Sequence, residues 1–498
     1  MKSICKDNTL RQITFVLFMS GLWAASAWGQ ARDINYYIDR CPFKMPLVVE
    51  PVFASRTFVI TDYGAEGDGQ KLNTQAFAQA IKECSRAGGG TVIVPPGLWL
   101  TGPIELCSNI NLHLEQGAVI LFTPDHTQYP MIQLSGPNST PVTASPIYGY
   151  KLKNIAITGQ GILDGAGHSW RPVKKEKTTK DQWKDLVATG GVVSKDGKIW
   201  WPSAEAMNGS EYLNKLKKTH PKHAPEVYQQ ARDFLRPHMV SLINCENILV
   251  EGVTLRNSPK FVFIPYNCKN ITIRYANIYN DWWAQNGDGI DISACQSVII
   301  YGCTINVGDD AICMKSSGRL STGPRLKDII IAGCTVYHGH GGFVIGSGTS
   351  GGMQNIFVSD CSFLGTDIGI RVKTGIDRGG LVKDIFMNGI YMADIKGAAI
   401  LFNPFYASKL VGTKEEPTKT SAVLDKFPVF CDFHFDNIYC RRAEKAMILT
   451  GLSQSPLKKL FFNKVTILAE HGCEISDAQE LHFKDCNIQA HSDAVSGK

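Results

Sequence analysis

The stretch NILVEGVTL at residues 247–255 is followed by NITIRYANI at residues 270–278 and by SVIIYGCTI at residues 297–305. Each stretch begins with a polar residue, alternates apolar positions, and passes a small residue before a second apolar pair. Similar stretches begin at residues 154, 328, 355, 384, 459 and 480. From residue 247 to residue 384, successive starts are separated by 23, 27, 31, 27 and 29 residues. The chain therefore contains an internal repeat with a period of roughly 20–30 residues.

The repeat indicates strands, because β-branched and aromatic residues form short runs that Gly, Asn or Asp interrupts. A repeat of this length with strands and little helix is typical of a parallel β-solenoid. In such a fold each coil stacks on the next at about 4.8 Å. Leucine-rich repeats need a regular leucine consensus, which is absent, and a β-sandwich shows turn signals about every 8–12 residues. We therefore predict an all-β parallel β-helix.

The open end of a solenoid needs a cover, and residues 73–84 are suited to provide one. Their apolar residues have the i, i+3, i+4 spacing of an amphipathic helix. Gly88-Gly89-Gly90 follows, and residues 91–94 have the composition of a strand. The sequence therefore predicts an N-terminal capping helix.

Residues 165–240 interrupt the repeat, and part of this insertion has the composition of a helix. It is either a solvated surface excursion or a wall over a substrate groove. Trp170, Trp183, Trp200 and Trp201 lie within it, and four tryptophans are costly to leave in water. These tryptophans favour the interpretation of the insertion as a packed wall.

The first residues of the chain have the order of a secretory signal. Three basic residues precede an apolar run over residues 13–25, and the small residues Ala25-Ser26-Ala27 follow. The run is shorter than the roughly 20 residues of a membrane span. We predict that residues 1–29 are a signal peptide and that residues 30–498 form one β-helical domain. The protein is then secreted or periplasmic, without a membrane span.

The composition is that of a folded protein and gives no sign of a nucleic-acid partner. With 44% hydrophobic residues the chain has enough apolar material for a large core, and a formal charge of +6 does not indicate nucleic-acid binding.

The 15 cysteines include no CxxC pair. Two sets occupy fixed places in the repeat, which predicts stacked, buried thiols instead of disulfides or zinc ligands. These sets are Cys245, Cys268 and Cys295, and Cys303, Cys334 and Cys361.

Four polar clusters interrupt the apolar pattern: QNGDGID at residues 285–291, GDD at 308–310, GHG at 339–341 and RVK at 371–373. The steps from Asp288 to Asp309, from Asp310 to His340 and from His340 to Arg371 are 21, 30 and 31 residues. Each step approximates one coil, so we expect the clusters to stack on one face. Adjacent aspartates repel each other, and like charge gathered at one place often marks chemistry.

Carboxylates without a metal-binding motif favour hydrolysis of a glycosidic bond. One carboxylic acid protonates the leaving oxygen while an ionised one activates water. His340 is placed to tune the protonation of the acid. Arg371 and Lys373 alternate on a strand and therefore point the same way, which suits them to grip a substrate carboxylate. These residues indicate an acidic sugar, and we expect no metal or cofactor.

The motifs NxD, DD, GHG and RxK appear in this order, and the opening ITDYGAEGDG…NTQAFAQAI…GGGTVIVPPG precedes them. In these features the chain resembles glycoside hydrolase family 28, the polygalacturonases, over roughly residues 56–490 outside the insertion. The resemblance implies a right-handed β-helix and inverting hydrolysis of α-1,4-galacturonosyl linkages. The implied partner is a pectic polysaccharide or an oligogalacturonide.

The resemblance also implies catalytic roles. Asp309 corresponds to the general acid, and Asp288 and Asp310 correspond to the pair that holds the attacking water. His340 corresponds to the residue that supports the ionisation of the acid. Asp291 lies beside these motifs and is interpreted as a turn or supporting residue.

Five further residues are candidates for substrate binding. By resemblance, Arg371 and Lys373 bind galacturonate carboxylates, and Tyr406 matches a tyrosine that the family places beside the substrate. Asn286 is expected to orient its neighbours by hydrogen bonding. Lys315 follows the DD pair in DDAICMKS, as in the bacterial and plant exo-acting branch.

Gly287 stands where fungal endo-acting members have Thr or Ser, which also resembles the exo-acting branch. An insertion that blocks one end of the groove favours the same mode, the release of single galacturonates from non-reducing ends. The alternatives are an endo-polygalacturonase or a rhamnogalacturonan-directed hydrolase. More distant ones are a Ca²⁺-dependent pectate lyase and a non-catalytic, carbohydrate-binding β-helix.

Overall fold

The computed structural model describes residues 32–134, 139–219, 224–318, 323–406 and 427–491. The chain divides into two units, residues 1–41 and residues 42–498. The described part of the first unit contains helix α2 (Ile34–Asp39), whose first turn is capped by Asp33. The predicted signal peptide over residues 1–29 lies outside the described residues. Among the helices that are described, none is long and apolar enough to cross a membrane.

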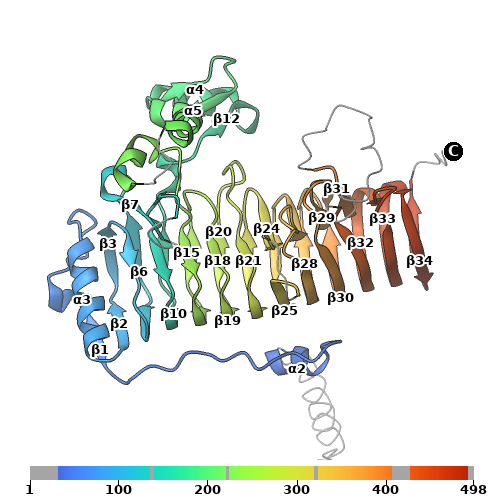
Figure 1. Ribbon diagram of the computed structural model, residues 1–498, viewed down its shortest axis with the longest axis horizontal. Helices are drawn as coiled ribbons and strands as arrows, with labels where there is room; N and C mark the ends of the chain where they lie inside the picture. Colours follow the sequence, from blue (N-terminus) through green and yellow to red (C-terminus); the bar gives the residue numbers. More distant parts are fainter. Residues whose placement is uncertain (1–31, 135–138, 220–223, 319–322, 407–426, 492–498) are drawn as a thin grey trace, which may run out of the picture. The chain divides into compact units, whose positions relative to one another are not determined.

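The second unit is the predicted right-handed parallel β-helix, and Figure 1 shows its coils following one another in chain order. Three stacks of parallel strands run along it. The first stack contains β1 (Thr57–Val59), β2 (Gly90–Val94), β5 (Ile110–Leu114), β10 (Lys153–Gly159), β16 (Glu246–Glu251), β19 (Lys269–Arg274), β22 (Gln296–Tyr301) and β25 (Leu326–Ala332). It continues through the first parts of β28 (Met353–Leu364), β30 (Leu381–Ala393), β32 (Val429–Thr450) and β33 (Leu457–Ser476) to β34 (Ala478–Lys484).

The second and third stacks complete each coil. The second contains β3 (Gly97–Thr101), β6 (Ala118–Phe122), β11 (Ile162–Asp164), β17 (Thr254–Arg256), β20 (Asn277–Tyr279), β23 (Thr304–Asn306), β26 (Thr335–Tyr337), later parts of β28, β30, β32 and β33, and β35 (Asn487–Ala490). The third contains β4 (Ile104–Glu105), β9 (Ile147–Tyr150), β15 (Val240–Ile243), β18 (Phe263–Tyr266), β21 (Ile290–Ser293), β24 (Asp310–Lys315), β27 (Gly341–Ile345), β29 (Ile370–Lys373), β31 (Ile395–Asn403) and the ends of β32 and β33.

The polar residue that opens each repeat turns the chain at a corner. Asn154, Asn247 and Asn270 have φ angles of 54°, 58° and 56°, in the left-handed region that asparagine tolerates. Their side chains also join the coils. The Nδ2 of Asn247 donates to the Oδ1 of Asn154 at 2.8 Å, and the Nδ2 of Asn270 donates to the Oδ1 of Asn247 at 2.9 Å. The start of the repeat is therefore both a turn signal and an inter-coil contact.

The interior of the β-helix is a continuous apolar core. Ile248 pairs with Ile271 on the next coil, and Ile271 pairs with Val298 on the coil after it; all three are buried. The predicted cysteine stack is confirmed at two steps. The backbone N–H of Cys245 donates to the Sγ of Cys268 at 3.2 Å, and the N–H of Cys268 donates to the Sγ of Cys295 at 3.4 Å.

The N-terminal cap is helix α3 (Thr74–Arg86), which buries Phe77, Ile81 and its other predicted apolar residues against the first coils. Gly89 has a φ of 103°, and a Cβ there would lie 2.4 Å from the backbone oxygen of Asn109. Only glycine fits this turn between the cap and β2. The predicted capping helix is confirmed.

The insertion is partly helical, as predicted, and lies beside the N-terminal coils (Figure 1). Its elements are β12 (Val173–Lys174), α4 (Lys180–Ala188), β13 (Val192–Val193), β14 (Ile199–Trp201) and α5 (Ala204–Thr219), with 3₁₀ turns at Gly167–Ser169, Lys175–Lys177 and Pro225–Ala231. The remaining described elements are the hairpin β7 (Met131–Ile132) and β8 (Val142–Thr143), and 3₁₀ turns at Ile60–Tyr63 and His126–Gln128.

The insertion packs against the β-helix through a half-buried polar contact around Trp170. The His126 ring stacks on Trp170 with 3.5 Å between ring centroids, and its Nδ1 lies 2.9 Å from an oxygen of Asp233. The Ser203 hydroxyl donates to the other oxygen of Asp233 at 2.6 Å. Trp170 and Trp200 are buried and Trp183 and Trp201 are half-buried, so the tryptophans are packed, whereas helix α4 buries none of its residues.

Candidate active site

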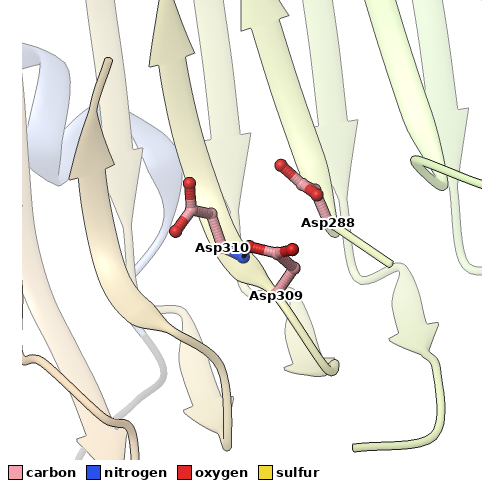
Figure 2. Close-up of side chains that lie close together, drawn as sticks. All are labelled: Asp288, Asp309 and Asp310. Carbon is pink, nitrogen blue, oxygen red and sulfur yellow. Dashed lines mark hydrogen bonds between the residues drawn. The ribbon is translucent and has the colours of Figure 1, made fainter. Parts of the chain in front are cut away.

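The four polar clusters lie on neighbouring strands of the third stack, which pair in the order β21, β24, β27 and β29. Asp288 precedes β21, Asp309 and Asp310 stand at the start of β24, His340 precedes β27, and Arg371 and Lys373 belong to β29. Figure 2 shows Asp288 on one coil and Asp309 and Asp310 on the next. One carboxylate oxygen from each of the three lies within 4.8 Å of the others.

Asp309 is paired with His340. An oxygen of Asp309 lies 3.0 Å from the Nδ1 of His340 and also accepts the backbone N–H of Asp310 at 3.1 Å. Burial alone would raise the pKa of Asp309. The hydrogen bond and charge of His340, with the charges of Lys373 and Lys315, outweigh burial and hold that pKa below its usual value.

Asp288 and Asp291 share the ammonium group of Lys315. The Lys315 Nζ lies 3.0 Å from Asp288 and 2.7 Å from both oxygens of Asp291. Burial first, and then the charge of Asp291, raises the pKa of Asp288 well above its usual value. Burial also raises the pKa of Asp291, although Lys315 opposes it. Lys315, a predicted substrate-binding residue, is thus already engaged by two acids.

Asp310 is paired with the cations of β29. The Lys373 Nζ lies 2.6 Å from Asp310, and a terminal nitrogen of Arg371 lies 3.6 Å from the other oxygen. Burial alone would lower the pKa of Lys373, but the charge of Asp310 raises it. The exposed ring of Tyr406 lies 5.2 Å from the Arg371 guanidinium and 4.6 Å from the Lys373 ammonium. Three of the five predicted binding residues, Arg371, Lys373 and Tyr406, therefore lie together beside Asp310.

Two oxygens of the carboxylate cluster lack a hydrogen bond within the described chain, although one of them faces Arg371 at 3.6 Å. The Oδ1 of Asp288 and the Oδ1 of Asp310 are buried and accept no hydrogen bond from the described residues. A buried acceptor without a partner is costly, and a water molecule or a substrate hydroxyl would satisfy it. Asp309 is the most open of the three, with 19% of its side chain exposed against 5% for Asp288 and 3% for Asp310. The cluster thus combines two inner acceptors with one acid that faces outward.

The three carboxylates could ligate a cation by their spacing. Each already has a basic partner, however: Lys315 for Asp288, His340 for Asp309 and Lys373 for Asp310. These partners compensate the negative charge that would attract a divalent ion. That the site works without a metal stays a prediction.

A comparison with protein-family models matches residues 174–486 to the model described as "Glycosyl hydrolases family 28". The chain belongs to this family. It is a glycoside hydrolase, so the predicted family, enzyme class and fold are confirmed.

Curated relatives and solved structures agree with the assignment. A probable polygalacturonase of Vitis vinifera is 29% identical over 82% of this chain and 73% of its own length. An exo-poly-alpha-D-galacturonosidase of Dickeya chrysanthemi is 25% identical over 86% of this chain and 70% of its own length. The crystal structure of a hyperthermoactive exopolygalacturonase from Thermotoga maritima is 28% identical, with a TM-score of 0.71, covering 88% of this chain and 94% of that one.

Sequence reasoning missed one positioning residue of this family 28 hydrolase. A terminal nitrogen of Arg236, from the end of the insertion, donates to the Oδ1 of Asn286 at 3.0 Å, and the other donates to the backbone oxygen of Gln285 at 3.1 Å. Arg236 thereby holds the loop that leads to Asp288. Because Arg236 belongs to no motif and no repeat, the sequence contains no signal for this contact.

We expect Lys315→Met to lower the free energy of unfolding by about 3–5 kcal/mol at neutral pH, because it leaves two buried carboxylates without a cation. Burial then keeps the folded-state pKa values of Asp288 and Asp291 above those of the unfolded chain. The unfolded chain releases these protons first as the pH rises, so the loss should grow from about pH 4 to about pH 8. Denaturant titration at both pH values measures it.

The double variant Lys315→Met/Asp291→Asn is the matched control, because it removes one of the two stranded charges. It should recover most of the lost stability. An equal loss at both pH values, or no recovery in the double variant, would contradict the shared-ammonium arrangement.

Proposed function

We propose that this hydrolase cleaves α-1,4-galacturonosyl linkages of pectin with inversion and releases galacturonic acid from non-reducing ends. The central observation is the carboxylate cluster with two unsatisfied oxygens, bordered by Arg371 and Lys373. The polygalacturonase names of the relatives support the substrate. The insertion, which packs as a wall on the N-terminal side of the cluster, supports the exo mode.

Asp309 is the proposed general acid, because its half-buried carboxyl is the most open of the three and can reach a leaving oxygen. In the site without substrate, the raised pKa of Asp288 and the lowered pKa of Asp309 favour a proton on Asp288. Asp309 must therefore gain its proton when substrate binds. Exclusion of water and the arriving galacturonate carboxylate both raise the pKa of a nearby carboxyl.

Asp288 and Asp310 are proposed to hold the attacking water through their unsatisfied oxygens. Once the proton has moved to Asp309, Asp288 is ionised and can accept one from that water. The three carboxylates have oxygens within 4.8 Å of one another, closer than the about 6.5–9.5 Å usual for inverting glycosidases. Inversion therefore rests on the family resemblance and not on the separation of the carboxylates.

Digestion of polygalacturonate should release monomeric galacturonate from the first minutes, because a walled groove admits only a chain end. Product chromatography tests the mode, and proton NMR of the first product should show the β anomer. Early mixed oligomers would indicate endo action. An unsaturated, ultraviolet-absorbing product that a chelator abolishes would indicate elimination.

Asp309→Asn should reduce hydrolysis of polygalacturonate by about 10²–10⁴-fold, the usual contribution of a general acid. The loss should be much smaller on α-galacturonosyl fluoride, because fluoride leaves without protonation. Asp288→Asn should reduce the hydrolysis of both substrates by a similar factor, since both reactions need the attacking water. Reducing-sugar and fluoride release measure the two reactions, and the reverse pattern would make Asp288 the acid.

We also propose that residues 1–29 direct export, which leaves residues 30–498 as one secreted or periplasmic catalytic domain. The order of basic, apolar and small residues supports this proposal. N-terminal sequencing of the exported protein should begin at Trp28 or Gln30. Active protein that retains Met1 in the cytosolic fraction would contradict it.

A further inference from the structure

A cavity of about 630 Å³ lies between the insertion and the third strand stack. Outward-facing side chains of β15 and β18, among them Tyr266, form its floor, and the insertion contributes Trp201 and residues 234–238. Asn286, two residues before Asp288, also lines it. The cavity therefore opens beside the carboxylate cluster, on the side of the N-terminal coils. Arg371 and Lys373 lie on the other side of the cluster, on the C-terminal coils.

Arg236 and Lys260 bring positive charge into this cavity. No aspartate or glutamate is among its described lining residues, and neither cation forms an ion pair within the described part of the chain. Burial, followed by the charge of Arg171, lowers the pKa of Arg236 to about 10. Burial, followed by the charge of Arg236, lowers the pKa of Lys260, although the more distant carboxylates of Asp288 and Asp291 oppose this. Both cations are thus partly desolvated, and the positive charge of Arg236 disfavours the charged form of Lys260.

The other cations of the site differ in this respect. Lys315 is neutralised by Asp288 and Asp291, and Lys373 is neutralised by Asp310. Buried charge without a counterion costs free energy that an arriving anion recovers. Lys260 is therefore placed to receive an external anion, beside Arg236, whose terminal nitrogens also hold the loop through Gln285 and Asn286.

The rest of the lining suits a sugar. The Nδ1 of His238 and the Oε1 of Gln285 are buried and have no hydrogen-bond partner among the described residues. Sugar hydroxyls donate and accept hydrogen bonds and would satisfy both atoms. Trp201 and Tyr266 add aromatic surface, which is typical of ligand cavities that also contain a few fixed polar groups.

We infer that Arg236 and Lys260 bind the carboxylate of the sugar on the non-reducing side of the cleaved bond. This inference rests on the proposed function, in which that sugar is the terminal galacturonate. The insertion then does more than close the groove: through Arg236 it supplies part of an acid-specific pocket. The enzyme then binds a carboxylate on each side of the cleaved bond, with Arg236 and Lys260 on the non-reducing side and Arg371 and Lys373 on the reducing side.

Lys260→Met tests the inference most cleanly, because Lys260 makes no side-chain hydrogen bond to the described protein and Met has a similar length. The substrates are trigalacturonate and the same trisaccharide methyl-esterified only at its non-reducing terminal carboxyl. Wild-type kcat/KM should fall roughly 10- to 100-fold on the ester, the range expected for losing one charge-assisted contact. The kcat/KM of Lys260→Met should be lower than that of wild type by a similar factor on the free acid and should differ little from it on the ester.

Lys82→Met, on the exposed face of α3, is the matched control and should leave both rates unchanged. A thermal unfolding midpoint equal to wild type shows that Lys260→Met is folded. If Lys260→Met lowers kcat/KM equally on both substrates, or on neither, the inferred carboxylate pocket is contradicted while the proposed function stands. If the wild-type enzyme does not hydrolyse trigalacturonate, the proposed function itself fails.

Discussion

The pairing of each coil with the next is the constraint on which the rest of this protein depends. Parallel strands place a residue beside another about one repeat away, and the side-chain alternation of a strand decides whether it points inward or outward. The asparagine corners hold this register, because the left-handed turn at Asn247 and its amide contacts recur from coil to coil. A slip of one residue would exchange the apolar core with the outer face.

That register makes a dense group of charges possible. The carboxylates of Asp288, Asp309 and Asp310 are too close to remain ionised together without compensation, and each has a basic partner from another coil. Compensation is uneven, so the pKa of Asp288 rises while that of Asp309 falls. Acid–base chemistry uses such differences between neighbouring carboxyls, and in the proposed mechanism substrate binding reverses this one.

The insertion adds what the repeat lacks. A regular solenoid presents an open groove, whereas the insertion, anchored through His126, Trp170 and Asp233, closes one side of it. Arg236, near the end of the insertion, also donates a hydrogen bond to Asn286 in the loop that leads to Asp288. In the proposed function, the segment that breaks the repeat contributes to specificity, while the proposed catalytic groups are carried by the repeat itself.

The sequence by itself determined the architecture and the composition of the site. Its repeat predicted the parallel β-helix, its 3.6-residue periodicity predicted the cap α3, and the steps of 21, 30 and 31 residues predicted that the four clusters share one face. These are local or periodic features, and periodicity survives in a one-dimensional string.

Only the tertiary structure decided which charges meet. It paired Lys315 with Asp288 and Asp291, placed Lys373 against Asp310, and brought Arg236 and Lys260 to the same cavity. These contacts depend on side-chain reach and burial across coils and on the path of a non-repeating insertion. Neither spacing nor composition encodes those quantities, since they arise only when the chain is packed.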